Sequence, residues 1–295
     1  MALRALITGI DGFTGRYLFK ELEASGYTVF GLSAASTSGH TTFHCDICDA
    51  VAVREVVEQV RPDYVFHLAA IAFVQHGDVD NIYRTNILGS RNLLAALANC
   101  DHRPRGVLMV SSANVYGNVA SGIVDEQTPA IPANDYAVSK LAMEHMANLW
   151  RDQLPITTVR TFNYSGVGQS RQFLLPKIVD HIRRRSPVLE LGNLEVVRDF
   201  SDVRTVVEIY RRILEKNEPG KLFNVCSGVG YSLQNVLEMA REIAGYMPEI
   251  RISPALVRAN EIKSLIGSNR ALERAIGRVD GYQLGETLEW MLLAP

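Results

Sequence analysis

Apolar, β-branched runs alternate with amphipathic segments of helical length through the first half of the chain. The runs that predict strands are Ala5–Ile10, Thr28–Leu32, Thr42–Asp46, Tyr64–Ala70, Val107–Ser112 and Ile156–Phe162. Between the first two runs, Phe13–Ala24 predicts a helix with Leu18 and Leu22 on its apolar face. This alternation predicts an α/β fold with a doubly wound parallel sheet, whose ligands bind beyond the carboxyl ends of the strands.

The pattern loosens after Phe162 and predicts a second, smaller lobe. The elements expected there are a basic helix near Gln172–Arg185, a strand at Leu222–Val225, and helices near Leu233–Ala244 and Asn269–Ile276. No repeat or linker interrupts the chain, so we expect interleaved lobes with a cleft between them. The larger covers residues 1–162 plus about 199–228, and the smaller about 163–198 plus 229–295.

The composition narrows the possible partners. A chain of 295 residues with 47% hydrophobic content can bury a large core. Its net charge of -2 and pI of about 6.4 give no general basic field that would gather nucleic acid or an anionic membrane. No uncharged apolar run of about 18 residues and no signal-peptide pattern occurs, so we expect neither a membrane span nor export.

The cysteines favour a reducing compartment. Cys45, Cys48, Cys100 and Cys226 are too few and too scattered for a disulfide framework, so we expect a cytoplasmic protein. Cys45 and Cys48 form a C-x-x-C motif, but no second pair or histidine cluster accompanies it. Because zinc takes four ligands, we expect no metal.

Three glycines follow the first predicted strand in G-x-x-G-x-x-G spacing. A side chain at Gly9 or Gly12 would hold the backbone away from a pyrophosphate, and one at Gly15 would separate helix from strand. Phe13 and Thr14 begin the helix, whose free N–H groups face the anion. The position of this motif, after a strand and before an amphipathic helix, predicts dinucleotide binding.

The end of the second strand indicates which dinucleotide is bound. NAD enzymes place an acid there for the ribose 2′-hydroxyl, but this chain has Ser33 and no carboxylate between Ala24 and Cys45. Arg16 is either a partner for a 2′-phosphate or a solvated helix residue. We therefore expect NADP(H) to be preferred over NAD(H).

A phenol and an ammonium lie four residues apart, on one face of a predicted helix. These are Tyr136 and Lys140, and the cation is expected to lower the pKa of the phenol. Tyr136 then exchanges a proton with a substrate oxygen while a hydride moves to or from nicotinamide. Ser112, at the end of the fifth strand, is the expected third catalytic residue, with Ser111 as its competitor.

Four motifs together resemble the extended short-chain dehydrogenases/reductases, over essentially the whole chain. They are T-G-x-x-G-F-x-G from Thr8, H-L-A-A at His67–Ala70, S-S-x-x-V-Y-G from Ser111 and Y-x-x-x-K from Tyr136. The resemblance implies a Rossmann-type domain and further cofactor contacts from Asp46, Ile47, Leu68, Ala69, Ala70 and Asn86. Otherwise, Asp46 is an acid of a surface loop, Leu68–Ala70 belong to a buried strand, and Asn86 caps the start of a helix.

Within this family, the resemblance favours reduction at C4 of a nucleotide-linked sugar. Sugar 4,6-dehydratases carry an acidic pair where this chain has Ala113 and Asn114, which leaves reduction or epimerisation. The segments that resemble GDP-4-keto-6-deoxy-mannose reductases are Arg160–Asn163, Gly192–Phe200, Asn224–Gly228 and Leu265–Asn269. Residues Asn163–Gln169 depart from that group, so the hexose and the product stereochemistry stay open.

The same resemblance implies a set of substrate contacts in the second lobe. Asn163, Arg198 and Arg258 would hold the diphosphate, and Glu261 a ribose hydroxyl. The alternatives are an ion pair between Arg198 and Asp199, and a surface position for Arg258.

The expected activity is reduction of GDP-4-keto-6-deoxy-D-mannose to GDP-D-rhamnose or its C4 epimer, for polysaccharide biosynthesis. The rivals are a nucleotide-sugar 4-epimerase with tightly bound NAD, a dTDP-4-keto-6-deoxyhexose reductase, and a dinucleotide sensor without catalysis. Helices near Tyr83–Ala98 and Tyr136–Trp150 resemble those that form a four-helix bundle in family dimers, so we expect a homodimer.

Overall fold

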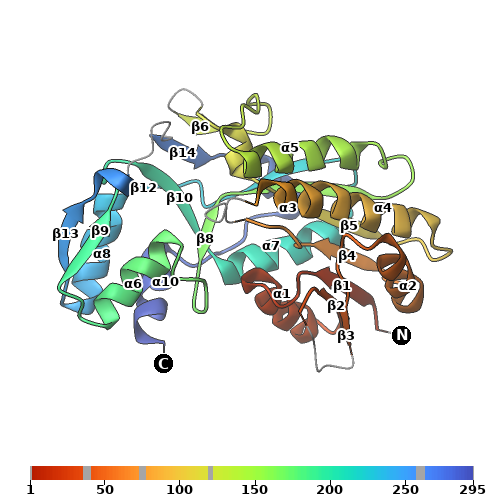
Figure 1. Ribbon diagram of the computed structural model, residues 1–295, viewed down its shortest axis with the longest axis horizontal. Helices are drawn as coiled ribbons and strands as arrows, with labels where there is room; N and C mark the ends of the chain where they lie inside the picture. The colour runs from red at the N-terminus through yellow and green to blue at the C-terminus, as the bar shows by residue number, and fades with distance from the viewer. Residues whose placement is uncertain (1, 36–40, 73–77, 119–121, 257–262, 295) are drawn as a thin grey trace.

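A seven-stranded sheet forms one side of the molecule (Figure 1). The structure is a computed structural model and describes residues 2–35, 41–72, 78–118, 122–256 and 263–294. The strands run in the order β11-β7-β5-β4-β1-β2-β3, and every neighbouring pair is parallel. Their bounds are β1 (Arg4–Thr8), β2 (Thr28–Ser33), β3 (Thr42–His44), β4 (Tyr64–His67), β5 (Gly106–Ser112), β7 (Ile156–Thr161) and β11 (Leu222–Val225). The expected doubly wound, Rossmann-type sheet is therefore confirmed.

Helices cover both faces of this sheet because each turns an apolar stripe toward it. On one face, Leu18 of α1 and Val206 of α7 share a buried core with the strands, and α9 packs beside them. On the other face, Val53 of α2 and Met143 of α5 form a second core with α4. The bounds are α1 (Phe13–Ala24), α2 (Ala50–Val60), α3 (Val79–Tyr83), α4 (Ser90–Asn99), α5 (Asp135–Asn148), α7 (Val203–Lys216) and α9 (Arg270–Ile276).

Several strands end earlier than their apolar runs predict. β4 stops at His67 although its run continues to Ala70, and β3 stops at His44 although its run continues to Asp46. Apolar character does not distinguish the last residues of a strand from a segment that leaves the sheet to line a cavity. The residues that leave are at the carboxyl edge, where a doubly wound sheet binds its ligands.

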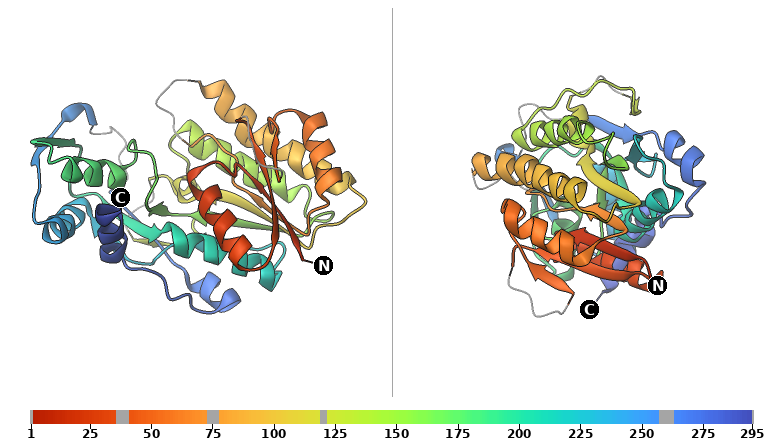
Figure 2. Two further views of the ribbon diagram at one scale, coloured as in Figure 1. Left: turned by 90° about the horizontal axis from the view of Figure 1, so that it is seen from below. Right: turned by 90° about the vertical axis from the view of Figure 1, so that its right-hand side faces the viewer.

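The second lobe lies beyond that edge, at the left of Figure 1, and Figure 2 shows it from two further sides. A short sheet runs in the order β12-β10-β14-β6, with β8 beside β10, and β9 pairs with β13. The strands are β6 (Ile123–Val124), β8 (Asn163–Ser165), β9 (Val188–Leu191), β10 (Val197–Asp202), β12 (Gly230–Ser232), β13 (Glu249–Ile252) and β14 (Ser264–Gly267). The helices are α6 (Leu174–Arg183), α8 (Leu233–Ala244) and α10 (Leu284–Leu293), which share their own core.

Short helices complete the two lobes. They are a π-helix over Arg84–Gly89 and 3₁₀-helices at Ala113–Tyr116 and Pro254–Leu256. The π-helix joins α3 to α4, so the helix expected near Tyr83–Ala98 extends from Val79 to Asn99. The chain passes from the large sheet to the small one and back, as an interleaved lobe requires, while the domain boundaries themselves stay a prediction. Among the helices of the described part of the chain, none has the length and apolar character of a membrane span.

Candidate active site

A cavity of about 480 Å³ lies between the carboxyl edge of the large sheet and the second lobe. Its walls come from the glycine-rich turn, the ends of β4 and β5, the start of α5, and the loop after β7. The lining residues that the sequence singled out are Gly9, Gly12, Phe13, Thr14, Gly15, Leu68, Ala70, Ser111, Ser112, Ala113, Asn114, Tyr136, Lys140 and Asn163. Motifs that lie far apart in the sequence therefore meet at one cavity, as the strand-end argument predicts.

The glycine-rich turn has the shape that a pyrophosphate requires. Gly9 has a φ of 72°, and a Cβ on Gly15 would lie 2.4 Å from the Gly9 carbonyl oxygen. The Gly12 N–H donates to the same oxygen at 3.0 Å. Gly12 provides no side-chain cap for α1, and the first turn carries no acid. The N–H groups of α1 are thus directed at an anion site, and a dinucleotide fits the turn.

Aromatic contacts join the start of α1 to β8 and to the turn that follows it. The Thr14 hydroxyl lies 2.7 Å from the Tyr164 hydroxyl, and the rings of Phe13 and Tyr164 stack with centroids 6.1 Å apart. The Tyr17 hydroxyl donates to the Val167 carbonyl oxygen at 2.7 Å. Tyr164 belongs to the segment that departs from the mannose-reductase pattern, and this departure therefore contacts the cofactor turn as well as the cavity.

Tyr136 and Lys140 lie one turn apart at the start of α5. Asn134 caps this helix by accepting from the Ala137 N–H at 2.9 Å. The Lys140 ammonium donates to the Val110 carbonyl oxygen at 2.7 Å, which ties the helix to the end of β5. The Ser112 hydroxyl lies near the Tyr136 hydroxyl and favours its ionised form. The three residues proposed from the sequence thus meet around one point of the cavity.

Burial of Tyr136 opposes the lowering of its pKa that is expected from Lys140. Desolvation by the surrounding protein raises the pKa of Tyr136 to about 12, and the Ser112 hydroxyl offsets only part of this. Burial also lowers the pKa of Lys140 to about 8, against the attraction of Glu144. Tyr136 is therefore a protonated acid at neutral pH in this structure.

The structure separates the roles of the two serines at the end of β5. Ser111 donates to the Glu144 carboxylate at 2.5 Å, and Glu144 forms a two-pronged ion pair with Arg160 at 2.8 and 3.0 Å. The Ser111 hydroxyl is therefore engaged in a buried network, although the residue borders the cavity. Ser112 instead accepts from the Asn114 N–H at 3.2 Å and contacts Tyr136. Ser112 is the better placed of the two.

Sequence reasoning missed the Glu144–Arg160 pair. The pair is buried, and the Arg160 guanidinium also lies over the Tyr116 ring, 4.8 Å from its centroid. Glu144 follows Lys140 by four residues on α5, so the two share one helix face. The four-residue spacing could have indicated that Glu144 lies on the buried face of the helix. A glutamate in that position needs a cationic partner, so the sequence could have predicted a buried ion pair.

The other implied cofactor residues divide into cavity walls and supports. Leu68 and Ala70 line the cavity, and the Ala69 N–H donates to the Thr8 hydroxyl at 3.1 Å. Asn86 lies behind this segment: its amide oxygen accepts from Ile71 at 2.8 Å, and its nitrogen donates to Ser139 at 2.9 Å. Asn86 is therefore a support for the wall in this structure.

His67 is a buried core residue whose ring nitrogens both have partners. Its ring nitrogens lie 2.8 Å from the Thr8 hydroxyl and 2.7 Å from the Ser90 hydroxyl. Burial lowers its pKa to about 3, so the ring stays neutral.

The adenosine end of the predicted site lies at the ends of β2 and β3. Asp46 is exposed and accepts from the Cys48 N–H at 2.8 Å, while Ile47 is buried against Gly89. The Arg16 guanidinium donates to the Gly168 carbonyl oxygen at 3.5 Å, so it reaches toward the second lobe. This contact favours the surface interpretation of Arg16 over the one that pairs it with a 2′-phosphate.

The predicted substrate residues are only partly described. Asn163 lines the cavity and donates to the Asp199 carbonyl oxygen at 3.3 Å. Arg198 and Asp199 point to opposite faces of β10, and the Asp199 carboxylate accepts from Ser227 and Gly228. The alternative ion pair between Arg198 and Asp199 is therefore wrong. Arg258 and Glu261 lie outside the described residues.

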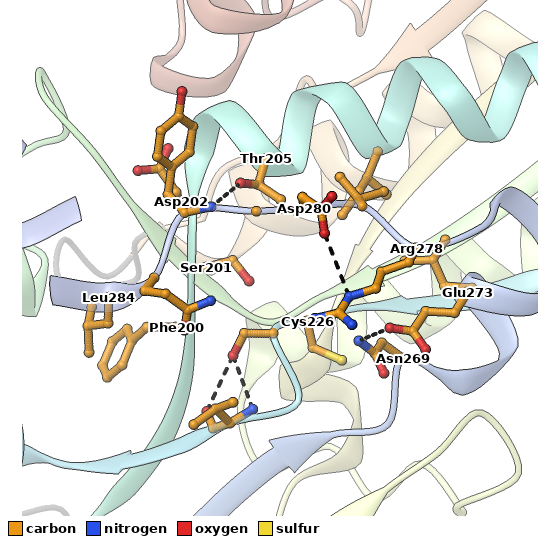
Figure 3. A pocket seen from close by; sticks show the side chains of 18 of the residues that line it. Phe200, Ser201, Asp202, Thr205, Cys226, Asn269, Glu273, Arg278, Asp280 and Leu284 are labelled. Carbon is orange, nitrogen blue, oxygen red and sulfur yellow. Dashed lines mark hydrogen bonds and ion pairs between the residues drawn. The ribbon is translucent and has the colours of Figure 1, made fainter. Parts of the chain in front are cut away.

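A second cavity, of about 250 Å³, opens on another side of β10 and is shown in Figure 3. Asp202, Glu273 and Asp280 line it, with Arg278 paired to Asp280 at 3.7 Å. Carboxylates outnumber cations in this lining, which disfavours an anionic ligand. We therefore assign the active site to the first cavity.

The C-x-x-C motif carries no cluster of metal ligands in the described part of the chain. There, no group of three His, Cys, Asp or Glu side chains gathers at ligand distances. Burial raises the pKa of Cys45 to about 11, so this thiol stays protonated.

Comparisons with known proteins agree with this geometry. A profile of the NAD dependent epimerase/dehydratase family matches residues 5–226. The chain is 34% identical to a GDP-6-deoxy-D-talose 4-dehydrogenase of Aggregatibacter actinomycetemcomitans, over 93% of this chain and 92% of the relative. It is 32% identical to a GDP-6-deoxy-D-mannose reductase of Pseudomonas aeruginosa, over 94% and 92%.

A solved structure shows the same arrangement of elements. The structure of RMD from Pseudomonas aeruginosa complexed with NADPH superimposes with a TM-score of 0.87 and 30% identity, covering 99% of this chain and 98% of that one. That structure holds NADPH, a nicotinamide dinucleotide, which is the class of ligand that the glycine-rich turn fits here. The chain belongs to the NAD dependent epimerase/dehydratase family, the extended short-chain dehydrogenases/reductases, and is a nicotinamide-dependent oxidoreductase.

Proposed function

We propose that the chain reduces the C4 keto group of a nucleotide-linked 4-keto-6-deoxyhexose, and that this substrate is GDP-4-keto-6-deoxy-D-mannose. The observation that carries the proposal is the placement of the Ser112, Tyr136 and Lys140 side chains at the wall of the same cavity that the glycine-rich turn lines. Carbonyl reduction needs an acid where the oxygen gains its proton, and a phenol with a pKa of about 12 is such an acid at neutral pH. The names of two relatives, both acting on GDP-6-deoxyhexoses, support the substrate class.

Each catalytic residue has one task in this mechanism. The nicotinamide ring, when bound, supplies the hydride that C4 receives. Ser112 donates a hydrogen bond to the keto oxygen, and Tyr136 transfers its phenolic proton to that oxygen. Lys140, one turn further along α5, stabilises the phenolate that Tyr136 becomes. The product is an alcohol at C4, either GDP-D-rhamnose or its C4 epimer.

The glycine-rich turn would hold the cofactor during this reaction. Gly9, Gly12 and Gly15 let the backbone approach the pyrophosphate, and the first N–H groups of α1 donate to it. Leu68 and Ala70 would lie along the dinucleotide. The choice between NADP(H) and NAD(H) depends on the groups at the end of β2.

The two residues that follow Ser112 support reduction over dehydration. Ala113 and Asn114 follow Ser112 and line the cavity, and neither side chain titrates. In the second lobe, Asn163 and Arg198 would hold the diphosphate. Arg258 and Glu261 are further candidates from the sequence.

The test is the oxidation of reduced nicotinamide, followed by its absorbance, with enzymatically prepared GDP-4-keto-6-deoxy-D-mannose. The dTDP-4-keto-6-deoxy-D-glucose analogue is the comparison substrate: it keeps the keto group but changes the nucleotide and the configuration at C2. Turnover with the GDP sugar alone is expected. Turnover with the dTDP sugar alone would show that the substrate carries dTDP and not GDP. No turnover with either, together with NAD that co-purifies, would reject the reductase in favour of a 4-epimerase.

The proposal includes a homodimer in the cytoplasm. Leu88 on the π-helix, Val138 on α5 and Leu149 after α5 are exposed apolar side chains on neighbouring helices. A second copy that packs these helices into a four-helix bundle would cover them. Light scattering should give twice the protomer mass of 32.7 kDa, and a single protomer mass would reject the dimer.

A further inference from the structure

A carboxylate reaches the end of β2 from another segment of the chain. Asp11 lies at the tip of the glycine-rich turn, between Gly9 and Gly12, and its side chain accepts a hydrogen bond from the Ser33 hydroxyl. The turn is fixed there because the Gly9 N–H donates to the Leu32 carbonyl oxygen at 2.9 Å. Ser33 is the last residue of β2, the strand whose end normally carries the acid of an NAD enzyme.

The segments around β2 offer little to balance a second negative charge, and Arg84, a cation near the end of β3, interacts with the Cys48 thiol. Between Lys20 and Arg54 the sequence contains no lysine and no arginine. Arg16 donates to the Gly168 carbonyl oxygen, and the His44 ring lies 3.1 Å from the Ala34 carbonyl oxygen. Asp46, at the end of β3, adds another exposed carboxylate to this edge of the sheet. A 2′-phosphate, which carries about two negative charges, would be repelled here, whereas a ribose hydroxyl would find an acceptor.

We propose that Asp11 determines the cofactor specificity of this enzyme: it accepts from the adenosine ribose hydroxyls of NAD(H) and disfavours the 2′-phosphate of NADP(H). The inference rests on the proposed function, since it concerns the same dinucleotide site. It reverses the NADP(H) preference expected from the missing acid, because that expectation considered only the residues after β2. Asp11 supplies the missing carboxylate from the preceding turn, and Ser33 holds it in position.

The experiment is an equilibrium titration of the cofactor-free protein with NADH and with NADPH, followed by protein fluorescence and without any sugar substrate. The wild-type protein should bind NADH about tenfold more tightly than NADPH, or better. Asp11→Asn keeps the size of the side chain and removes its charge. In this variant the ratio of the NADPH to the NADH dissociation constant should fall at least about tenfold, chiefly because NADPH binds more tightly. Glu23→Gln, which removes one exposed charge from α1, is the matched control and should keep the wild-type ratio.

A second measurement needs no variant. ADP-ribose and its 2′-phosphate differ only in the group that Asp11 is proposed to sense. ADP-ribose should displace NADH from the wild-type protein at a concentration about tenfold lower than its 2′-phosphate. Raising the salt concentration should narrow this difference, because screening weakens the repulsion between exposed charges.

The outcomes separate this inference from the function on which it rests. Tighter binding of NADPH than NADH by the wild-type protein, or an unchanged ratio in a folded Asp11→Asn variant, would overturn the role of Asp11 and leave the reductase intact. If neither dinucleotide binds, the proposed reductase function itself is rejected.

Discussion

The catalytic end and the adenosine end of the cavity edge are built in different ways. At the catalytic end, Ser111 donates to Glu144, Glu144 pairs with Arg160, and all three side chains are buried. At the adenosine end, Asp11 and Asp46 are exposed. Groups that must hold reacting atoms are fixed by a network spanning β5, β7 and α5. The adenosine end can change its charge without disturbing the core.

The largest effect is expected from removing the proton donor. Tyr136→Phe keeps the ring and should lower kcat by about 10²- to 10⁴-fold, because the keto oxygen loses its acid. Tyr246→Phe, which removes a hydroxyl bonded to the Ser186 carbonyl oxygen in the second lobe, is the matched control and should keep kcat. Steady-state kinetics decide this, and equal rates for the two variants would reject the mechanism.

The buried ion pair should give the largest change in stability. Glu144→Gln leaves the Arg160 guanidinium buried without a countercharge and should lower the free energy of unfolding by about 3–5 kcal/mol. Glu58→Gln, which removes one partner of an exposed pair with Arg54, should change it by less than about 1 kcal/mol. Urea denaturation measures both. Similar losses of unfolding free energy in the two variants would show that the buried Glu144–Arg160 pair stabilises the fold no more than an exposed pair does.

The two serines of β5 should separate activity from stability. Ser112→Ala should lower kcat by about 10²-fold, because a donor to the keto oxygen is lost. Ser111→Ala should keep most of kcat but lower the free energy of unfolding by about 1–3 kcal/mol, because the Glu144 carboxylate loses a buried donor. Parallel kinetics and denaturation test the division, and the reverse pattern would exchange the roles of the two hydroxyls.

The pKa of Lys140 gives a pH dependence to the stability of the cofactor-free protein. Burial lowers this pKa from 10.5 to about 8, so between these values the unfolded chain binds more protons than the folded one. The free energy of unfolding should therefore gain a rising contribution as the pH increases from about 8 to 10. Lys140→Met removes the titrating group, and its slope should be lower over this range. Equal slopes would contradict the assigned pKa.

The smallest effect is expected at the adenosine end. Asp46→Ala removes an exposed carboxylate that accepts from the Cys48 N–H, so the free energy of unfolding should change by about 0.5 kcal/mol. The dissociation constant of the dinucleotide should rise by less than about tenfold, with kcat unchanged. A loss of kcat comparable to that of Ser112→Ala would remove the contrast between the two ends.

The sequence predicts the fold well because its signals are local. The bounds of α1, α8 and β11 follow directly from apolar periodicity and from breakers such as Gly12 and Gly245. The glycine spacing and the Tyr136–Lys140 pair are local for the same reason, since one turn or one helix carries each of them.

The features that the sequence did not predict depend on contacts between distant segments. The Glu144–Arg160 pair joins α5 to β7, and Asp11 meets Ser33 across 22 positions of the chain. The pKa of Tyr136 depends on the protein packed around it, including Tyr164 from the second lobe, which no helix spacing reveals. Pairings of this kind are set by the tertiary structure.

The hydrogen bond between Thr14 and Tyr164 links the wall of the cavity to the first turn of α1. Tyr164 belongs to the segment that departs from the mannose-reductase pattern and lines the cavity, and its hydroxyl and ring also contact the first turn of α1. A substitution selected there for a new hexose will also alter how firmly that turn is held. A change of side chain at this one position therefore acts on the cavity and on the glycine-rich turn together.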